Sequence, residues 1–115
     1  MSWQVSLYEN ERLLQVDRFQ NGCETNRKGE VFARVEVSYN FSPFYYQAFD
    51  KKLGLMWLHG KQANTCVRKL GRAVKKLGTE RTDNPRESAA ENAGYLLALL
   101  LKWAKEHPKA ILEVI

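Results

Sequence analysis

VFARVEVSY, residues 31–39, is the stretch of sequence that decides the fold. Its odd-numbered positions hold valine, alanine and tyrosine, whereas its even-numbered positions hold phenylalanine, arginine, glutamate and serine. A period of two residues places each set of side chains on its own face of a β-strand. The stretch therefore predicts a strand with one face on a hydrophobic core.

Further strands are predicted on both sides of this one. Trp3, Val5 and Leu7 alternate with polar neighbours, and residues 13–19 form a second candidate strand. Residues 20–28 are polar and contain Asn21-Gly22, which is typical of a loop or wide turn. The apolar residues 110–115 predict a last strand at the other end of the sequence.

A short helix and a long amphipathic helix are expected after residue 40. Ser42 can cap a helix and Pro43 suits its first turn, so residues 43–52 predict the short helix, ended by Gly54. Residues 55–59 form an apolar connection of no assigned type. Apolar residues then recur at spacings of three and four over residues 62–77, which predicts the long helix, with Gly78 at its C-terminal cap.

A second long helix is predicted before the last strand. Asn84 and Pro85 have the pattern of an N-cap followed by proline, and Ser88 or Asn92 are alternative starts. The helix is expected to end near His107, because a proline follows it. Together these elements predict a single α+β domain over residues 1–115, in which a small, mostly antiparallel sheet packs against two long helices and one short helix.

The composition is that of an ordinary globular protein. Hydrophobic residues make up 44% of the chain and charged residues 27%. No signal-peptide pattern follows Met1, and the longest apolar run, residues 95–101, is too short to cross a bilayer, so we expect no membrane association. Cys23 and Cys66 are isolated, which favours free thiols and a reducing, cytoplasmic location.

Positive charge is concentrated in one part of the chain. Residues 51–81 hold nine of the 18 basic residues and one of the 13 acidic residues, so this segment carries +8. The remaining nine basic and twelve acidic residues give −3, which leaves a net charge of +5. A strongly basic segment favours contact with an anionic partner, although a solvated surface is the simpler alternative.

The predicted long helix carries most of this charge on one side. Its cations follow one another at helical spacing, opposite the apolar residues, and no acidic residue interrupts them. Like charges one turn apart destabilise a helix slightly, so their retention favours an anion-binding role. The predicted partner-binding cations are Arg68, Lys69, Arg72, Lys75 and Lys76, joined by Lys61.

An aromatic segment directly precedes the basic segment. Residues 39–49 hold six aromatic side chains, and most of them are expected in the core. Tyr45 or Tyr46 could instead offer a ring to a base, and Asn40 could add a polar contact where the strand meets the helix.

Sequence motifs for catalysis are weak. Gly60-Lys61 does not match a phosphate-binding loop, because Gln62 stands where that motif needs Ser or Thr. His59 and Cys66 are conceivable as base and nucleophile, but Cys66 lies on the apolar side of its helix, where a buried thiol is expected. The cysteines and histidines show no zinc spacing. We therefore expect no enzyme activity, no cofactor and no metal.

Residues 31–115 also resemble small bacterial and phage proteins that have no established activity. The likeness rests on Tyr39-Asn-Phe-Ser-Pro43, on Asn92-Ala-Gly94 in a late loop, and on a last helix that ends at His107-Pro108. The family pattern has a Gly-Trp-Gly-like loop where this chain has Asn92-Ala-Gly94. The resemblance implies a stand-alone accessory protein, with any site near Asn40, Ser42 and the Asn-rich loop.

The sequence thus predicts a non-enzymatic binding module with a basic helix face for an anionic partner. Nucleic acid or a nucleotide is the favoured partner. The alternative is a protein-interaction module, such as a phage-type accessory or inhibitor protein that docks on an acidic protein surface. That alternative requires an exposed apolar patch rimmed by lysines. The oligomeric state stays open.

Overall fold

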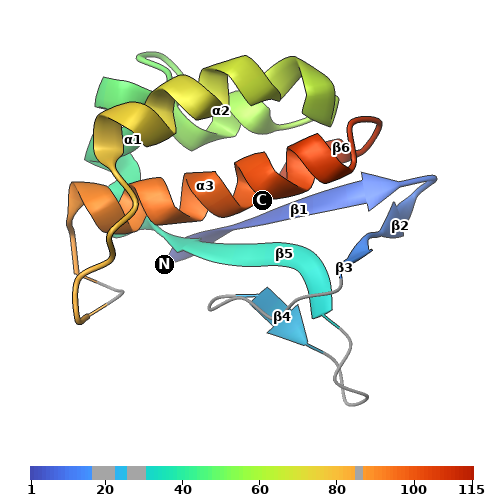
Figure 1. Ribbon diagram of the computed structural model, residues 1–115, viewed down its shortest axis with the longest axis horizontal. Coiled ribbons are helices and arrows are strands. Elements are labelled where there is room, and N and C mark those ends of the chain that lie inside the picture. Colours follow the sequence, from blue (N-terminus) through green and yellow to red (C-terminus); the bar gives the residue numbers. More distant parts are fainter. Residues whose placement is uncertain (17–22, 26–30, 85–86) are drawn as a thin grey trace.

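A computed structural model describes residues 1–16, 23–25, 31–84 and 87–115, with only the backbone described in Cys23–Thr25. The described residues form a six-stranded antiparallel sheet and a layer of helices, which confirms the predicted α+β class (Figure 1). The strands are β1 (Ser2–Glu9), β2 (Arg12–Leu13), β3 (Gln15–Val16), β4 (Cys23–Thr25), β5 (Val31–Ser38) and β6 (Ile111–Val114). The helices are the 3-10 helices η1 (Tyr39–Phe41) and η2 (Gly54–Leu58) and the α-helices α1 (Ser42–Ala48), α2 (Ala63–Leu77) and α3 (Ala90–Glu106).

Strands β1 and β5 form the centre of the sheet. They pair from Ser2↔Ser38 to Ser6↔Arg34, and β6 pairs with β1 from Val5↔Val114 to Tyr8↔Ile111. The alternation predicted for β5 is present over residues 31–37, whose odd-numbered members are buried. It is wrong for Tyr39, which begins η1 and is 41% exposed. The predicted strands at both ends of the chain are confirmed as β1 and β6.

The second predicted strand, residues 13–19, is wrong as one continuous strand. Its described part forms two short strands, β2 paired with β1 and β3 paired with β5. Leu14 joins them: its N–H donates to Leu7 O at 3.0 Å, and its carbonyl accepts from Ala33 N at 2.8 Å. The chain therefore crosses from β1 to β5 at this point, and this change of partner divides the strand.

The predicted loop over residues 20–28 needs a correction, because Cys23–Thr25 forms β4 and pairs with β5. Sequence reasoning missed β4 because three residues are too few to show an alternating pattern. The remaining residues of that predicted loop, and residues 17–19 of the predicted second strand, lie outside the described residues.

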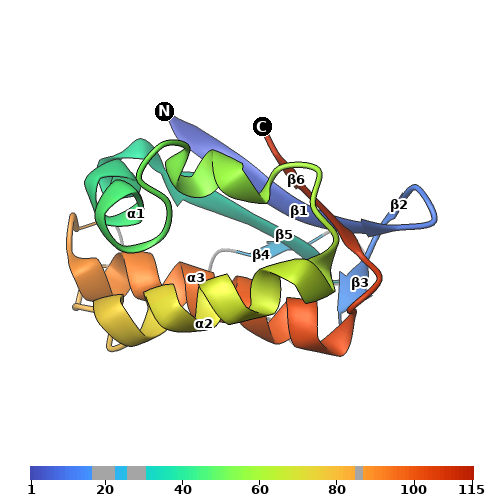
Figure 2. The same cartoon turned by 90° about the horizontal axis from the view of Figure 1, so that it is seen from above.

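Helices α2 and α3 run antiparallel and cover one face of the sheet, with α1 and η2 toward its β6 side (Figures 1 and 2). Helix α3 is buried on most of its circumference, because it packs against both β5 and α2. Helix α2 buries one side only. The outer side of α2 is consequently available to a partner.

Two glycines let α2 and α3 meet closely. Gly78 follows α2 with φ of 82° and donates its N–H to Val74 O at 2.9 Å, which confirms the predicted cap. A Cβ atom at Gly94 would lie 1.9 Å from the carbonyl oxygen of Gly78 and 2.9 Å from Cβ of Leu77. Only glycine permits this contact, so the close packing of α3 against the end of α2 explains why residue 94 is a glycine.

Helix α3 begins at Ala90, so the predicted start at Asn84 is wrong, and the true start falls between the alternatives Ser88 and Asn92. The buried Asn92 side chain accounts for the difference. Its Oδ1 accepts from Thr82 N at 3.0 Å, and its Nδ2 donates to carbonyl oxygens of Asn84 and Glu87. These bonds hold the preceding segment in a loop and satisfy the amide of Asn92 inside the protein.

The short helix is also shifted from its prediction. Helix α1 begins at Ser42 and ends at Ala48, because Ser42 lies within the helical turn and donates its hydroxyl to Tyr39 O at 2.7 Å. Ser38 serves as the side-chain cap one turn earlier, since its Oγ accepts from Asn40 N. The apolar connection at residues 55–59 forms η2 up to Leu58.

Candidate functional site

The exposed side of α2 carries four of the predicted cations. We call Arg68, Arg72, Lys75 and Lys76 the basic face. They lie on the side of the helix away from its buried residues, and α2 contains no acidic residue. All four are exposed, and within the described part of the chain none of them takes part in an ion pair.

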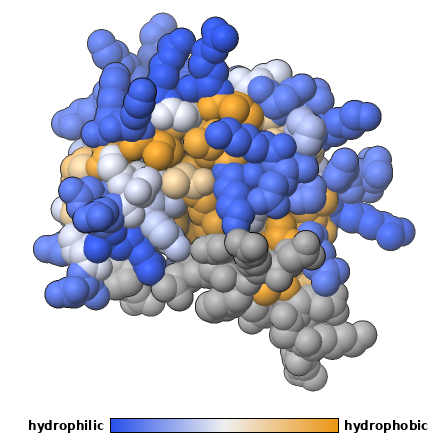
Figure 3. Space-filling view, in the orientation of Figure 1, coloured by the Kyte–Doolittle hydropathy of each residue, from blue (hydrophilic) through white to orange (hydrophobic). Residues whose placement is uncertain are grey.

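The geometry of the helix spaces these cations regularly. One turn separates Arg68 from Arg72 and Arg72 from Lys76, which is a rise of ~6 Å for each step. Hydrophilic side chains project over α2 along the upper edge of the molecule in Figure 3. The basic face is therefore an open, convex row of charge.

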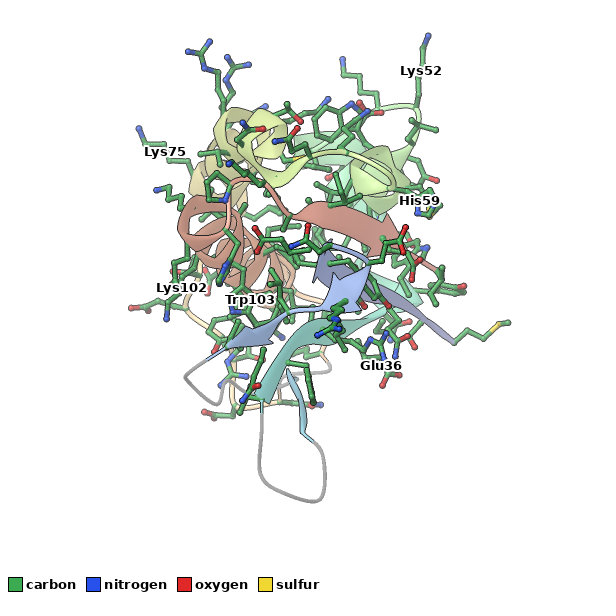
Figure 4. All side chains as sticks on the ribbon, turned by 90° about the vertical axis from the view of Figure 1, so that its right-hand side faces the viewer. Glu36, Lys52, His59, Lys75, Lys102 and Trp103 are labelled. Carbon is green, nitrogen blue, oxygen red and sulfur yellow. The ribbon has the colours of Figure 1, made fainter. Side chains whose placement is uncertain are left out.

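Helix α3 carries a half-buried cation, Lys102. In Figure 4, Lys75 of α2 and Lys102 of α3 point to the same side of the molecule, whereas Glu36 lies on the opposite side, beyond the sheet. Sequence reasoning did not single out Lys102, because the periodicity of one helix does not show to which side of the molecule another helix turns its residues.

Lys69 differs from the other predicted cations of α2. Its Nζ lies 2.8 Å from Oδ2 of Asp50, and both side chains are partly buried. The other oxygen of Asp50 accepts from the backbone N–H groups of Lys52 and Leu53. The hydrogen bond from Lys69 and these backbone bonds lower the pKa of Asp50 to about 2. Lys69 thus holds the turn after α1 against α2, and its charge is already paired.

Trp57 lies at the centre of a second group of contacts. The Nζ atoms of Lys69 and Lys61 lie 4.3 and 4.5 Å from the centroid of its ring. The ring of Phe49 meets it edge-on at a centroid distance of 5.5 Å. Trp57 itself is half-buried. The structure therefore brings the predicted cation Lys61 to an indole ring beside α2.

Sequence reasoning missed Trp57. The four-residue spacing between Trp57 and Lys61 was visible in the sequence, but it carries meaning only if the segment turns as a helix does. The contact with Lys69, twelve residues away, depends on the fold.

The two predicted tyrosines have different environments. Tyr45 is fully buried and donates its hydroxyl to Ala93 O at 3.1 Å, and burial raises the pKa of this phenol. Its ring cannot reach a partner, which corrects its assignment to the site. Tyr46 is 44% exposed, and its ring faces the backbone of Gly54. Tyr46 remains an accessible ring.

Asn40 is exposed in η1, and its hydrogen bonds are made with Ser38 and Ser88 rather than with residues of the basic face. Its N–H donates to Ser38 Oγ, and its carbonyl accepts from the hydroxyl of Ser88 at 3.2 Å. This bond joins the Asn40 junction to the loop before α3. The expectation that Asn92-Ala-Gly94 lies in that loop is wrong, because these three residues belong to the first turns of α3. The buried side chain of Asn92 bonds back to the preceding loop from α3, so its role is structural.

An exposed apolar group accompanies the lysines that precede η2. Tyr46, Leu53 and Met56 are 44%, 51% and 38% exposed. Lys51 and Lys52 lie directly before Leu53 in the chain and are exposed as well. We call these three apolar side chains the η2 patch.

The residues considered for catalysis do not come together. Cys66 is buried, its Sγ donates to Gln62 O at 3.5 Å, and burial raises the pKa of the thiol. The Nδ1 atom of His59 accepts from Val114 N at 3.0 Å, which ties η2 to β6. Among the described residues, no group of three or more potential metal-ligating side chains is present.

No protein-family model, curated protein or solved structure matches this chain. The resemblance to small bacterial and phage proteins therefore stays a prediction. None of the helices that the structure describes is both long and apolar enough to cross a membrane.

Proposed function

We propose that this protein is a nucleic-acid-binding module and that the basic face of α2 holds the phosphate backbone. The observation that carries the proposal is the set of four exposed cations on a helix without an acidic residue, none of them ion-paired within the described residues. Proteins retain such unneutralised rows where phosphates supply the opposite charge.

The shape of the basic face favours nucleic acid over a single nucleotide. Cations spaced by ~6 Å along a convex helix can contact several neighbouring phosphates of a continuous backbone. A mononucleotide can engage only part of this row. The exposed position of the cations also favours phosphate contacts, which hold a backbone in place without reading its sequence.

Salt dependence of binding tests the proposal. We expect the affinity for a fluorescein-labelled duplex oligonucleotide, measured by anisotropy, to fall as salt rises from about 25 to 200 mM. Four phosphate contacts predict a slope of about −3.6 in a plot of log K against log salt concentration. Replacing Arg72 by Gln should make this slope less steep by about 0.9.

Arg12→Gln is the matched control, because it removes one exposed charge from β2 and leaves the same net charge as R72Q. We expect R12Q to keep the wild-type slope. The absence of any retained nucleic acid at low salt, or equal effects of R12Q and R72Q, would refute a site on the basic face.

A protein-interaction module is the second candidate function, and the η2 patch favours it. Tyr46, Leu53 and Met56 are exposed, and the exposed Lys51 and Lys52 directly precede Leu53 in the chain; a docking surface for an acidic protein combines these residue types. The test is a pull-down of a protein partner with and without nuclease treatment. This candidate is supported over nucleic acid if the partner is retained after nuclease treatment and is lost when Leu53 and Met56 are both replaced by Asp. Retention that nuclease abolishes would exclude it.

A further inference from the structure

We infer that the nucleic acid is single-stranded and that Trp57 is the ring on which one of its bases stacks. This inference rests on the proposed function. Proteins that bind single strands combine a row of cations with an aromatic side chain, because each unpaired base has a free face. Bases within a duplex already stack on one another and cannot use such a ring.

The first argument is the position of Trp57 beside the basic face. Its ring contacts Nζ of Lys69, and Lys69 lies about one turn before Arg72 and two turns before Lys76 on α2. A base on Trp57 would therefore lie close to the cations that hold the neighbouring phosphates. Among the described rings, Trp57 is the one that lies against two lysine ammonium groups.

The second argument is the difference between these two lysines. Asp50 holds Lys69 in place at 2.8 Å, so Lys69 remains beside the ring when a ligand arrives. Lys61 has no ion pair among the described residues, although its backbone is fixed by bonds with Leu58 and Leu112. The Lys61 ammonium can therefore move from the indole to a phosphate, and its departure would expose the ring of Trp57 for stacking with a base.

The third argument is the contact between Phe49 and the ring of Trp57. Phe49 is buried and meets Trp57 edge-on, with an interplanar angle of 89°. This contact fixes the indole in one orientation and reduces the entropy that it loses when a base stacks on it. Trp57 is half-buried, so its outer part remains reachable from solvent.

Two probes of equal length test the inference: an oligothymidylate of about 12 nucleotides and a mixed-sequence duplex of about 12 base pairs. We expect the single strand to bind wild-type protein more tightly than the duplex. Trp57→Leu should weaken single-strand binding about tenfold and leave duplex binding and the slope with salt unchanged. Trp57→Phe keeps an aromatic ring and should retain most of the affinity.

Ultraviolet cross-linking gives a readout that needs no variant and so does not depend on the folding of W57L. An oligothymidylate with one 5-bromouracil should cross-link to Trp57 in the wild-type protein, as mapped by mass spectrometry. Cross-links that exclude Trp57, or equal affinities for both probes that W57L does not change, would overturn the inference. Duplex binding that still requires Arg72 would in that case leave the proposed function intact.

Discussion

Single residues show how the same chemical type takes different roles in this protein. Lys69 and Lys76 lie about two helical turns apart on α2, and both belong to the predicted basic helix. Lys76 is exposed and unpaired within the described residues, whereas Lys69 is bound to Asp50 and lies over Trp57. Only the residues brought near by the fold distinguish an exposed cation from one that is bound to its own chain.

The ion pair of Asp50 and Lys69 predicts a dependence of stability on pH. The pKa of Asp50 is lowered from 3.8 to about 2 in the folded protein, so the charged carboxylate stabilises the fold above about pH 4. This contribution is lost as the pH falls from 4 to 2. Asp50→Asn keeps an oxygen for the backbone N–H groups and removes the charge.

We therefore expect the difference in urea midpoint between wild type and D50N to be constant from pH 7 to 5 and to shrink toward pH 2. Lys69→Met should behave in the same way, because it removes the partner of the carboxylate. Lys75→Met is the control, since Lys75 is unpaired within the described residues. A difference between wild type and D50N that persists at pH 2 would contradict this account.

At the scale of elements, two helical glycines should respond in opposite ways to replacement by alanine, because one lies in the contact between α2 and α3 and the other does not. Gly94→Ala should destabilise the protein by about 2–3 kcal/mol, because its Cβ would meet the backbone oxygen of Gly78. Gly71→Ala is the matched substitution, since no atom lies within 4 Å of the added methyl group. It should stabilise α2 by up to about 1 kcal/mol.

Thermal unfolding followed by circular dichroism measures both changes. A lower melting temperature for G94A together with a higher one for G71A is the expected result. Equal effects of the two substitutions would show that the close approach of α3 to Gly78 does not limit the size of residue 94.

The sequence predicted those elements whose signals are local. Helix α2 was predicted to within one residue, because its apolar period lies within the helix itself and Gly78 follows it directly. The start of α3 was missed, because the side chain of Asn92 bonds back to a loop up to ten residues earlier. The candidate site follows the same division: the row of cations was visible as a period, whereas the burial of Tyr45 and the contacts of Trp57 depend on α3 and α2.

At the scale of the whole molecule, the charge is distributed unevenly around the fold. Lys75 of the basic face and Lys102 point to one side of the molecule, and Glu36 lies on the opposite side, beyond the sheet (Figure 4). The outer face of the sheet is bridged by polar contacts, including the bonds from Arg34 to Ser6 and Tyr8. Polar side chains on the outer face of the sheet thus bond to one another, whereas the cations of the basic face have no ion pair among the described residues.

Such a concentration of positive charge should cost stability in the free protein. Arg68 and Arg72 lie one turn apart in the middle of α2, where repulsion between like charges is not offset by the helix dipole. Replacing both by Gln lowers the net charge from +5 to +3 and should stabilise the protein by about 0.5 kcal/mol at low salt. This gain should disappear near 1 M salt, where charges are screened beyond about 3 Å.

Lys75 and Lys76 provide the contrast, because they lie in the last turn of α2 and interact favourably with the C-terminal end of its dipole. Neutralising these two lysines removes the same amount of charge but should give no gain in stability. Urea unfolding of both double variants at low and high salt measures the difference. If R68Q/R72Q were less stable than wild type at low salt, the two arginines would hold the fold together, and the basic face would not be a surface kept for a partner at the expense of stability.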